Sequence, residues 1–489
     1  MSKVNIILGP PGTGKTTTLL NLVDTHLAKG VAPNKIGFIS FTKKATEEAR
    51  DRAKVRFGFT DDDLQYFRTI HSIAFKMLGV STGAVMKFRD WQAFGEYIGI
   101  EIKGRNNVED GMLTSLERGD KLIFIEQLSR VRCVGLQQAW EDASEEDVSF
   151  QELDQVSRAL AQWKRANGKI DYTDMLTRYH EEGYVPELKI LFVDEAQDLS
   201  QLQWKIVERM AAKAETVYIA GDDDQAIFRW SGADVEHFIS LTGEVKTLDH
   251  SYRLPEAIRG LSEQLTDRID NRRKKRFKSN GLNGCVQYSN SVDDIELSTG
   301  QWLLLVRNGY MVKKLEDHCK NRGVFYSFRD KGPDFSDELL AARQWQLILK
   351  GANVSSENAR LIFKFIDVRP PRLSDKRYSL EDFKLPGVEI GPWFQTLSSM
   401  KVEDAEYIKS MLRAGEKLQE PPRVRLSTIH GAKGGESDNV ALFTDLSWKT
   451  YEAMQKFPDD EARCFYVGAT RAKKELTIIQ PESTRFFQI

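Results

Sequence analysis

Eight residues near the N-terminus have the types and spacing of a phosphate-binding loop. They read Gly-Pro-Pro-Gly-Thr-Gly-Lys-Thr over 9–16, which matches GxxxxGKT between a short apolar run and a stretch of helical period. Glycines let backbone N–H groups surround a phosphate, and the start of a helix adds partial positive charge. Lys15 would reach the β- and γ-phosphates, and the Thr16 hydroxyl could ligate Mg²⁺. The predicted loop residues are Gly9, Pro10, Pro11, Gly12, Thr13, Gly14, Lys15, Thr16 and Thr17.

Two adjacent acids follow a second apolar run, at 188–193. Asp194 would hold Mg²⁺ through water, and Glu195 would orient and deprotonate the water that attacks a phosphate. Two acids at the end of a strand also occur in a simple solvated turn. The glycine loop elsewhere in the chain favours the magnesium interpretation, because metal and phosphate sites of this kind occur together.

The elements that must position these residues alternate between strand and helix. Short apolar runs separated by helical stretches predict a parallel sheet covered by helices on both faces. Residues 75–185 break this pattern, since they are polar and mostly helical in period, and they predict a helical insertion. Its packing anchors would be Trp91, Trp140 and Trp163. The predicted strands are 4–8, 36–41, 188–193 and 216–220.

A second alternating region begins near Val245 and includes an apolar strand at 302–306. A proline-rich segment, at about 351–422, interrupts it and predicts a second insertion. The alternating pattern resumes at Val424 and continues to the end of the sequence. The fold class is therefore α/β, with two regions of alternating strands and helices.

Seven further segments, in order along the chain, resemble the motifs of superfamily 1A helicases, the UvrD/Rep/PcrA family. They are 40–45, 69–72, 194–198, 221–233, 251–253, 428–436 and 466–472. The resemblance implies two RecA-like P-loop motor domains with parallel sheets, each carrying a mainly helical insertion, with ATP between them. The implied bounds are 1–74 with 186–244 for the first motor domain, 75–185 for its insertion, 245–350 with 422–489 for the second motor domain, and 351–421 for a reduced second insertion.

The resemblance also implies roles for residues of the nucleotide site. Gln225 would contact the γ-phosphate and couple it to DNA, Tyr252 would stack on the adenine, and Glu436 would bind the ribose. Arg253 and Arg471 would stabilise the transition-state charge as arginine fingers. These roles agree with the chemistry of phosphoryl transfer, which needs positioning and charge stabilisation more than covalent help. The predicted catalytic residues are Lys15, Glu195, Gln225, Arg253 and Arg471.

A track for single-stranded DNA follows from the same motifs. Single strands are held by aromatic stacking and by contacts to the backbone charge. By resemblance, the aromatic residues face the bases and the polar ones contact phosphates or support their turns, although each aromatic could also be a core residue. The predicted residues are Phe41, Thr42, Thr69, His71, Phe228, Trp230 and His430.

Two features of this track are ambiguous. Many relatives carry Arg after the motif tryptophan, whereas this chain has Ser231 there and Arg229 on the other side. The densest basic run, 272–278, could line the DNA path or be a solvated helix end.

The resemblance also bears on recognition of the base. Larger relatives carry a glutamine before the first strand that reads the adenine edge, and the sequence leaves no room for that element before Gly9. This predicts a broad preference among nucleoside triphosphates.

Composition limits the remaining possibilities. Lys and Arg number 70 against 72 Asp and Glu, which excludes a strongly basic coat but not a local basic channel. No apolar run approaches about 18 residues and no signal peptide is evident, so we expect no membrane partner. The four cysteines form no CxxC pair, which argues against a zinc ribbon and fits reduced thiols in the cytoplasm.

The predicted function is that of an ATP- and Mg²⁺-dependent DNA helicase or translocase, moving 3′→5′ on single strands and at junctions between single and double strands. The polarity comes from the resemblance alone. An alternative is a translocase that strips proteins but unwinds poorly. Another is an ATPase subunit of a larger complex in DNA repair, replication or defence, active only with a protein partner.

Overall fold

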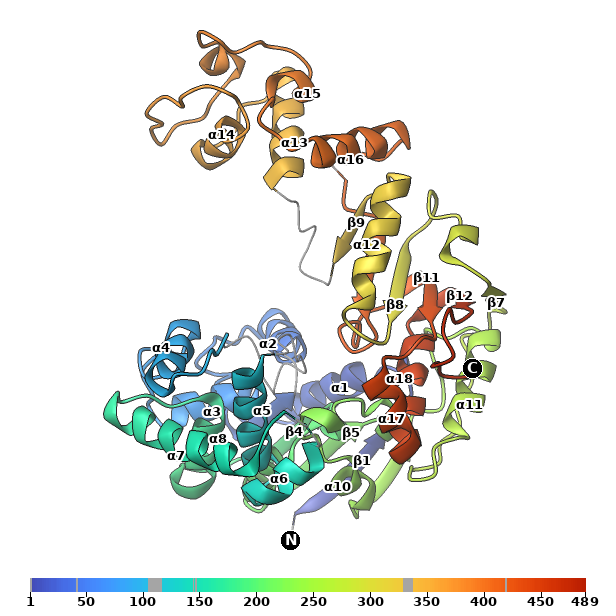
Figure 1. Ribbon diagram of the computed structural model, residues 1–489. Helices are drawn as coiled ribbons and strands as arrows, with labels where there is room; N and C mark the ends of the chain where they lie inside the picture. The colour runs from blue at the N-terminus through green and yellow to red at the C-terminus, as the bar shows by residue number, and fades with distance from the viewer. Residues whose placement is uncertain are drawn as a thin grey trace. The chain divides into compact units, whose positions relative to one another are not determined.

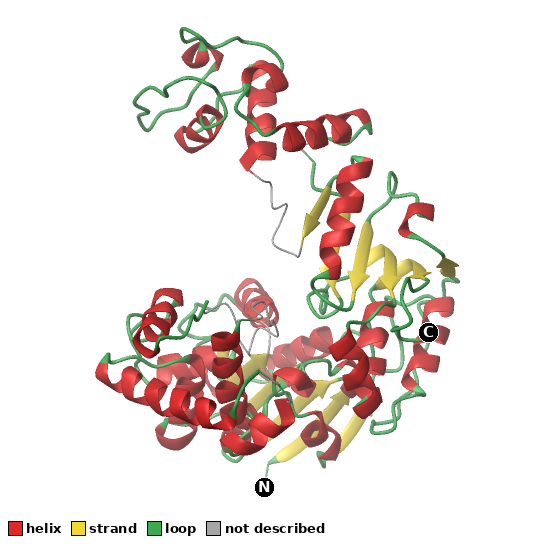
Figure 2. Ribbon diagram, viewed as in Figure 1, coloured by secondary structure: helices red, strands yellow, loops and turns green. Residues whose placement is uncertain are grey.

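The computed structural model contains two compact units. The first comprises Met1–Leu282 with Phe457–Val467, and the second comprises Asn283–Lys456 with Gly468–Ile489. The structure describes residues 2–40, 43–103, 117–143, 145, 147–328, 337–417 and 420–489. Each unit is built around its own sheet (Figures 1 and 2).

A six-stranded parallel sheet organises the first unit, in the order β3-β2-β4-β5-β1-β6. Its central strands read as continuous apolar runs because both faces are covered, and every residue of β4 is buried. This confirms the parallel sheet that the sequence predicts. The strands are β1 (Lys3–Leu8), β2 (Ile36–Ser40), β3 (Phe67–Arg68), β4 (Ile190–Asp194), β5 (Thr216–Gly221) and β6 (Glu244–Thr247).

The sixth strand differs from the sequence prediction in its partner. The sequence predicts that a second alternating region begins near Val245, whereas β6 pairs in parallel with β1 in the first sheet. Three of the four β6 residues are exposed. A short polar strand of this kind carries no apolar pattern that could assign it to one sheet or another.

Alternate residues of the strands enter two cores, one on each face of the first sheet. Ile7 packs with Leu19 and Leu20 of α1, whereas its neighbour Ile6 packs in a separate core with Trp204 of α9. This alternation follows from the two-residue period of a strand. The helices that accompany the strands are α1 (Lys15–Ala28), α2 (Lys43–Phe57), α9 (Gln201–Ala211), α10 (Val235–Ser240) and α11 (Glu256–Thr266).

The first insertion is helical, as the sequence predicts, and has its own apolar core. Trp91, Trp140 and Trp163 pack against that core, which confirms them as packing anchors. Helix α3 packs on α8 beside the first sheet. The helices of this region are α3 (Ile70–Met77), α4 (Phe88–Ile98), α5 (Arg118–Val131), α6 (Leu136–Ala143), α7 (Phe150–Ala166) and α8 (Tyr172–Glu182).

A second six-stranded parallel sheet organises the other unit, in the order β7-β12-β11-β8-β10-β9. All five residues of β8 are buried, as the apolar run 302–306 predicts. The strands are β7 (Cys285–Ser289), β8 (Trp302–Val306), β9 (Tyr326–Phe328), β10 (Val424–Thr428), β11 (Ser437–Phe443) and β12 (Ala472–Ile479). The accompanying helices are α12 (Met311–Arg322) and α17 (Trp448–Lys456), whereas all but the last two residues of α18 (Pro458–Ala469) belong to the first unit.

The second insertion forms a small helical body with one apolar core. Trp345 and Phe363 pack there against Phe383. The Tyr407 hydroxyl of α16 donates a hydrogen bond to the Val324 carbonyl, which ties this body to the end of α12. Its helices are α13 (Asp337–Leu349), α14 (Ser356–Phe363), α15 (Trp393–Thr396) and α16 (Val402–Arg413) (Figure 1). Within the described ranges, no helix combines the length and apolarity that a membrane crossing needs.

Candidate nucleotide and nucleic-acid sites

The predicted site residues of the first unit all lie at or after the carboxyl end of a strand in the first sheet. Because the strands are parallel, these ends share one edge of the sheet, which is where open α/β sheets bind ligands. Phe41 and Thr42 follow β2 but lie outside the described residues. The others are the phosphate loop after β1, Thr69 and His71 after β3, Asp194 and Glu195 at β4, Gln225, Phe228 and Trp230 after β5, and Tyr252 and Arg253 after β6.

The phosphate loop is closed by contacts within itself. Gly14 adopts a left-handed conformation with φ 77° and begins α1 without a side-chain cap. The Lys15 Nζ donates a hydrogen bond of 2.9 Å to the Gly9 carbonyl, and Lys15 fills the space that a Cβ at Gly9 would need. The lysine ammonium therefore lies over the loop, beside backbone N–H groups at the helix start that can accept a phosphate.

Two carboxylates from β4 meet the start of α1. The Thr16 hydroxyl donates to Asp194 at 2.8 Å, and the Lys15 ammonium lies 3.8 Å from a Glu195 oxygen. Burial, together with the adjacent Glu195 carboxylate, raises the pKa of Asp194 to about 7. Glu195 has a left-handed backbone, φ 52°, a conformation that costs a non-glycine residue about 1–3 kcal/mol and clusters at functional sites.

The oxygen atoms of this cluster fit Mg²⁺. Thr16 supplies a hydroxyl and Asp194 a carboxylate, and hard oxygen donors are what this cation prefers. In the described part of the chain, no group of three or more His, Cys, Asp or Glu side chains could hold a metal. A magnesium ion here would therefore need phosphate oxygens and water to complete its coordination.

Gln197 connects the two acidic motifs, a role that the sequence did not reveal. Its Nε2 donates to Glu195 at 2.6 Å, and its Oε1 accepts from the Asp222 backbone N–H at 2.9 Å. A Cβ at Gly221 would lie 2.6 Å from that same oxygen, so the glycine allows the approach. The Asp222 carboxylate in turn accepts from the Gln225 Nε2 at 2.6 Å. Gln197 lies inside the 194–198 motif, and its place in that motif was the sequence signal that could have identified it.

The segment 251–253 contacts the phosphate loop directly. The Ser251 hydroxyl donates to the Pro11 carbonyl at 2.7 Å, and the Tyr252 N–H donates to the Gly12 carbonyl at 2.8 Å. A Cβ at Gly12 would overlap Arg253. The structure thus brings Tyr252 and Arg253 to the loop, and the Tyr252 side chain is 74% exposed, which leaves its ring available for stacking.

An exposed aromatic residue that the sequence reasoning missed lies beside His71. The Tyr172 ring, at the start of α8, meets the His71 ring edge-on, with centroids 6.1 Å apart. Tyr172 is 46% exposed. Thr69 accepts from the Ser72 N–H and caps α3, which fixes the turn that carries His71. Only the packing of α3 on α8 brings these residues together, so no local signal in the sequence identifies Tyr172.

Trp230 is held against the first insertion. Its ring stacks on Phe124 of α5, with centroids 6.1 Å apart, and the residue is half-buried. Phe228, also half-buried, accepts a hydrogen bond from the Ser231 hydroxyl at 2.9 Å. The Arg229 guanidinium lies over the Phe457 ring and near Asp460.

The basic run 272–278 combines buried and exposed side chains, so neither a DNA-lining run nor a solvated helix end describes all of it. The Arg272 and Lys275 side chains are 9% and 1% exposed, and both are paired with Asp224. Lys274, Arg276 and Lys278 lie between and after them and are exposed. Two of the six basic residues of the run, Arg272 and Lys275, therefore neutralise buried acids of the 221–233 motif, a role that charge density alone does not distinguish from solvation.

The predicted residues of the second unit fall at opposite edges of its sheet. Glu436 and Arg471 directly precede β11 and β12, whereas His430 follows the carboxyl end of β10. The Arg471 guanidinium donates to the Gly435 carbonyl at 3.2 Å, so Arg471 lies beside Glu436. Lys473 lies 3.7 Å from the Glu436 carboxylate.

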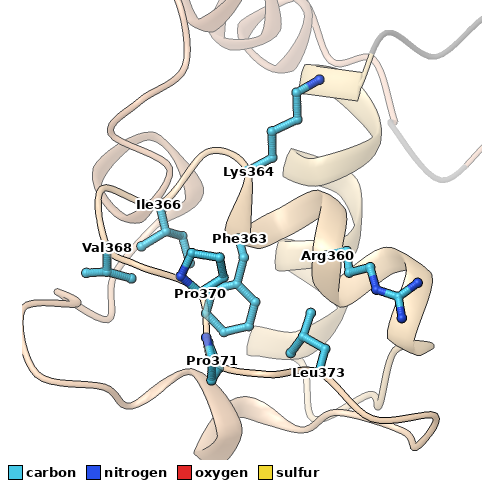
Figure 3. Close-up of a pocket in the computed structure, with 8 residues that line it drawn as sticks. All are labelled: Arg360, Phe363, Lys364, Ile366, Val368, Pro370, Pro371 and Leu373. Atoms are coloured by element: carbon cyan, nitrogen blue, oxygen red, sulfur yellow. The ribbon is translucent and has the colours of Figure 1, made fainter.

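A hollow in the second insertion is separate from these sites. It has a volume of about 510 Å³, and Phe363, Ile366, Arg360 and Pro370 are among the residues that line it (Figure 3). None of the predicted nucleotide or DNA residues lines it.

Comparisons with known proteins match nearly the whole chain. The model of the UvrD/REP helicase N-terminal domain matches residues 1–246, and that of the UvrD-like helicase C-terminal domain matches residues 200–483. The ATP-dependent DNA helicase PcrA of Bacillus subtilis is 24% identical over 317 residues, which cover 61% of this chain and 42% of that protein.

Two further relatives are named as helicases. The ATP-dependent DNA helicase srs2 of Schizosaccharomyces pombe is 26% identical over 474 residues, covering 84% of this chain and 52% of that protein. The ATP-dependent DNA helicase Rep of Buchnera aphidicola is 24% identical over 271 residues, covering 51% and 38%. The chain spans about half the length, or less, of these curated relatives.

Proposed function

Since the chain belongs to the UvrD/REP helicase family, we propose that it is an ATP-dependent DNA helicase or translocase that moves 3′→5′ along single-stranded DNA. The observation that carries the proposal is the cluster at the carboxyl edge of the first sheet. There Lys15 lies 3.8 Å from Glu195, and Thr16 lies 2.8 Å from Asp194. This set of groups can bind a triphosphate, hold its cation and activate a water molecule.

In the proposed reaction, each group of this cluster has a separate task. The Lys15 ammonium would exchange the Gly9 carbonyl for phosphate oxygens, while loop N–H groups bind the same phosphates. Thr16 and Asp194 would hold Mg²⁺, which when bound offsets phosphate charge. Glu195 would orient the attacking water and accept its proton, and the hydrogen bond from Gln197 would keep that carboxylate in place.

The rest of the nucleotide site is proposed from the resemblance together with local contacts. Tyr252 would stack on the base, and Arg253 would approach the phosphates. The hydrogen bonds from the Ser251 hydroxyl and the Tyr252 N–H hold their segment against the phosphate loop. Glu436 would bind the ribose, and Arg471 would act as a second arginine finger. Two cations directed at the γ-phosphate would stabilise charge in the transition state.

DNA would be held by aromatic and polar groups at the same edge of the first sheet. Trp230 and Tyr172 would stack on bases, alongside Phe228. Gln225 lies three residues before Phe228 in the loop after β5, so a shift of Gln225 at the γ-phosphate would be transmitted to Phe228 and Trp230. The remaining proposed contacts are Phe41, Thr42, Thr69 and His71 of the first unit, together with His430 of the second unit.

A second candidate is a translocase that works within a repair, replication or defence complex and unwinds weakly alone. The short second insertion, whose described part spans 337–417, favours it. A protein partner would then supply the strand separation that this chain lacks.

The test measures hydrolysis of ATP with Mg²⁺, in the presence and absence of single-stranded DNA or RNA. We expect DNA to stimulate turnover, and we expect Lys15→Ala and Glu195→Gln to abolish the stimulated rate. Lys35→Ala is the matched control, because Lys35 is a half-buried lysine that lies away from the phosphate loop in sequence and pairs with the exposed Glu187. Near-normal turnover in either variant would contradict the catalytic role proposed for that residue. Unwinding of duplexes with 3′ or 5′ tails decides polarity, and protein displacement separates the two candidates.

A further inference from the structure

The Lys275 ammonium is buried among three consecutive carboxylates. It lies 3.1 Å from Asp222, 2.6 Å from Asp223 and 2.9 Å from Asp224, and its side chain is 1% exposed. The ammonium donates hydrogen bonds to Asp223 and to the Arg273 carbonyl, and it forms ion pairs with Asp222 and Asp224. A planar guanidinium could not reproduce this arrangement, because its donors are fixed in one plane.

Charge explains why this lysine is needed. Three carboxylates are balanced by Lys275 and by Arg272, which binds Asp224 with two hydrogen bonds of 2.7 and 2.5 Å. The cluster of three carboxylates and two cations thus carries a net charge of −1. Burial disfavours a charged lysine, but the three carboxylates outweigh it and raise the pKa of Lys275. Without Lys275 the same carboxylates would carry a net −2 in a buried site, and they would repel one another.

This cluster reaches the nucleotide site through Asp222. One Asp222 oxygen contacts Lys275, and the other accepts the hydrogen bond of 2.6 Å from the Gln225 Nε2. The Asp222 N–H is also fixed by Gln197, the residue that binds Glu195. Displacing the Asp222 carboxylate would therefore break this hydrogen bond of the Gln225 amide.

We propose that Lys275 is a positioning residue for nucleotide hydrolysis, which holds the γ-phosphate-reading side chain of Gln225 in place through Asp222. The inference rests on the proposed function, because it takes Gln225 as the group that reads the γ-phosphate. It goes beyond that function by assigning the task to a residue of the basic run, outside all of the helicase-like motifs.

The experiment is a double-mutant cycle on DNA-stimulated ATP hydrolysis. We expect Lys275→Met to lower kcat about tenfold or more, with the Kd of a fluorescent ATP analogue changed by less than about threefold. Gln225→Ala should lower kcat to a similar extent. Because both changes act on the same amide, the double variant should lose no more than Gln225→Ala alone, whereas independent effects would multiply.

Lys164→Met is the matched control. Lys164 is also a buried lysine, with its ammonium 2.8 Å from Asp171 and 2.6 Å from Asp174, but it lies in the first insertion. The Lys164→Met variant should be less stable than the wild type but should keep the wild-type kcat. The second-site variant Lys275→Met/Asp223→Asn restores the cluster charge to −1, so it should recover most of the lost kcat. If Lys275→Met does not fold, the cycle is run in this Asp223→Asn background.

Three results would overturn the proposal. The first is a Lys275→Met enzyme with wild-type kcat, and the second is a double variant whose losses multiply. The third is a loss of kcat in Lys164→Met equal to that in Lys275→Met, which would reduce the effect to stability. In all three, the wild type still hydrolyses ATP and the proposed function stands. A wild type that hydrolyses no ATP would overturn both proposals.

Discussion

The Ser251 hydroxyl donates a hydrogen bond of 2.7 Å to the Pro11 carbonyl, across 240 residues of sequence. The adjacent Tyr252 N–H donates to the Gly12 carbonyl. The phosphate loop is therefore supported from outside by the segment that carries Tyr252 and Arg253. Any change that separates the two should affect phosphate binding and the position of the arginine together.

Gly12→Ala tests this support. Gly12 has φ +72°, which costs an alanine about 1–2 kcal/mol, and a new Cβ would also overlap Arg253. We expect a loss of unfolding free energy beyond that cost and weaker binding of ATP. Gly30→Ala is the control, since Gly30 has φ +83° with open space around it. Chemical denaturation measures the unfolding free energy, and nucleotide titration measures ATP affinity. Equal losses in the two variants would show that the contact with Arg253 contributes to neither.

Arg253→Ala and Arg471→Ala should each lower DNA-stimulated turnover by about 10³-fold, the loss that removal of an arginine finger causes. Binding of ATP should weaken far less, because a finger stabilises charge that develops in the transition state. Steady-state hydrolysis and nucleotide titration measure the two effects. Arg158→Ala, at a guanidinium whose side chain is 75% exposed, should change neither. A loss of only about twofold in turnover would contradict the arginine-finger role and indicate a structural role for that arginine.

Trp230→Ala should weaken binding of single-stranded DNA by about 1–3 kcal/mol, the value of one stacked base. It should also uncouple translocation from hydrolysis. Phe124→Leu removes the ring that supports Trp230 while keeping the tryptophan, so it reports the contribution of packing alone. Fluorescence titration with oligonucleotides and thermal melting separate the effects. Early melting with unchanged DNA affinity would make Trp230 a core residue.

Acid should weaken the first insertion through Asp171. Burial opposes its ionisation, but Arg130 and Lys164 outweigh this and hold the pKa of Asp171 well below its usual range. A carboxylate with a lowered folded-state pKa stabilises fully above its unfolded pKa of about 4, and the stabilisation is lost as the pH falls from there. Asp171→Asn should cost about 3–5 kcal/mol at pH 7, because it leaves buried cations without this partner.

The difference between wild type and Asp171→Asn should shrink as the pH drops below about 4, in urea unfolding measured from pH 3 to pH 7. Asp154→Asn is the control, because its partner Arg158 is largely exposed and such pairs contribute at most about 1 kcal/mol. A difference that stays constant over this range would contradict the role assigned to the Asp171 charge.

Local patterns in the sequence were enough to predict the first parallel sheet and the phosphate loop, and they indicated a second region of alternating strands and helices, whose parallel sheet was implied by the resemblance. Apolar runs such as 190–194 and 302–306 are strands because both faces of a parallel sheet exclude water. The loop 9–16 is a continuous segment whose glycines, lysine and threonine are predicted to bind phosphate together. Its chemistry depends on neighbours in sequence, so the spacing alone identifies it.

Contacts between distant segments were decided only by the tertiary structure. Lys275 and Arg276 look equivalent in sequence, yet one is buried among carboxylates and the other is exposed. Tyr172 becomes a candidate for base stacking only because α8 packs on α3 and brings it to His71. The strand β6 joins the first sheet through hydrogen bonds to β1, which its polar side chains do not encode. In each case the side-chain type is common to many environments, and the partner that gives it a role arrives only when the chain folds.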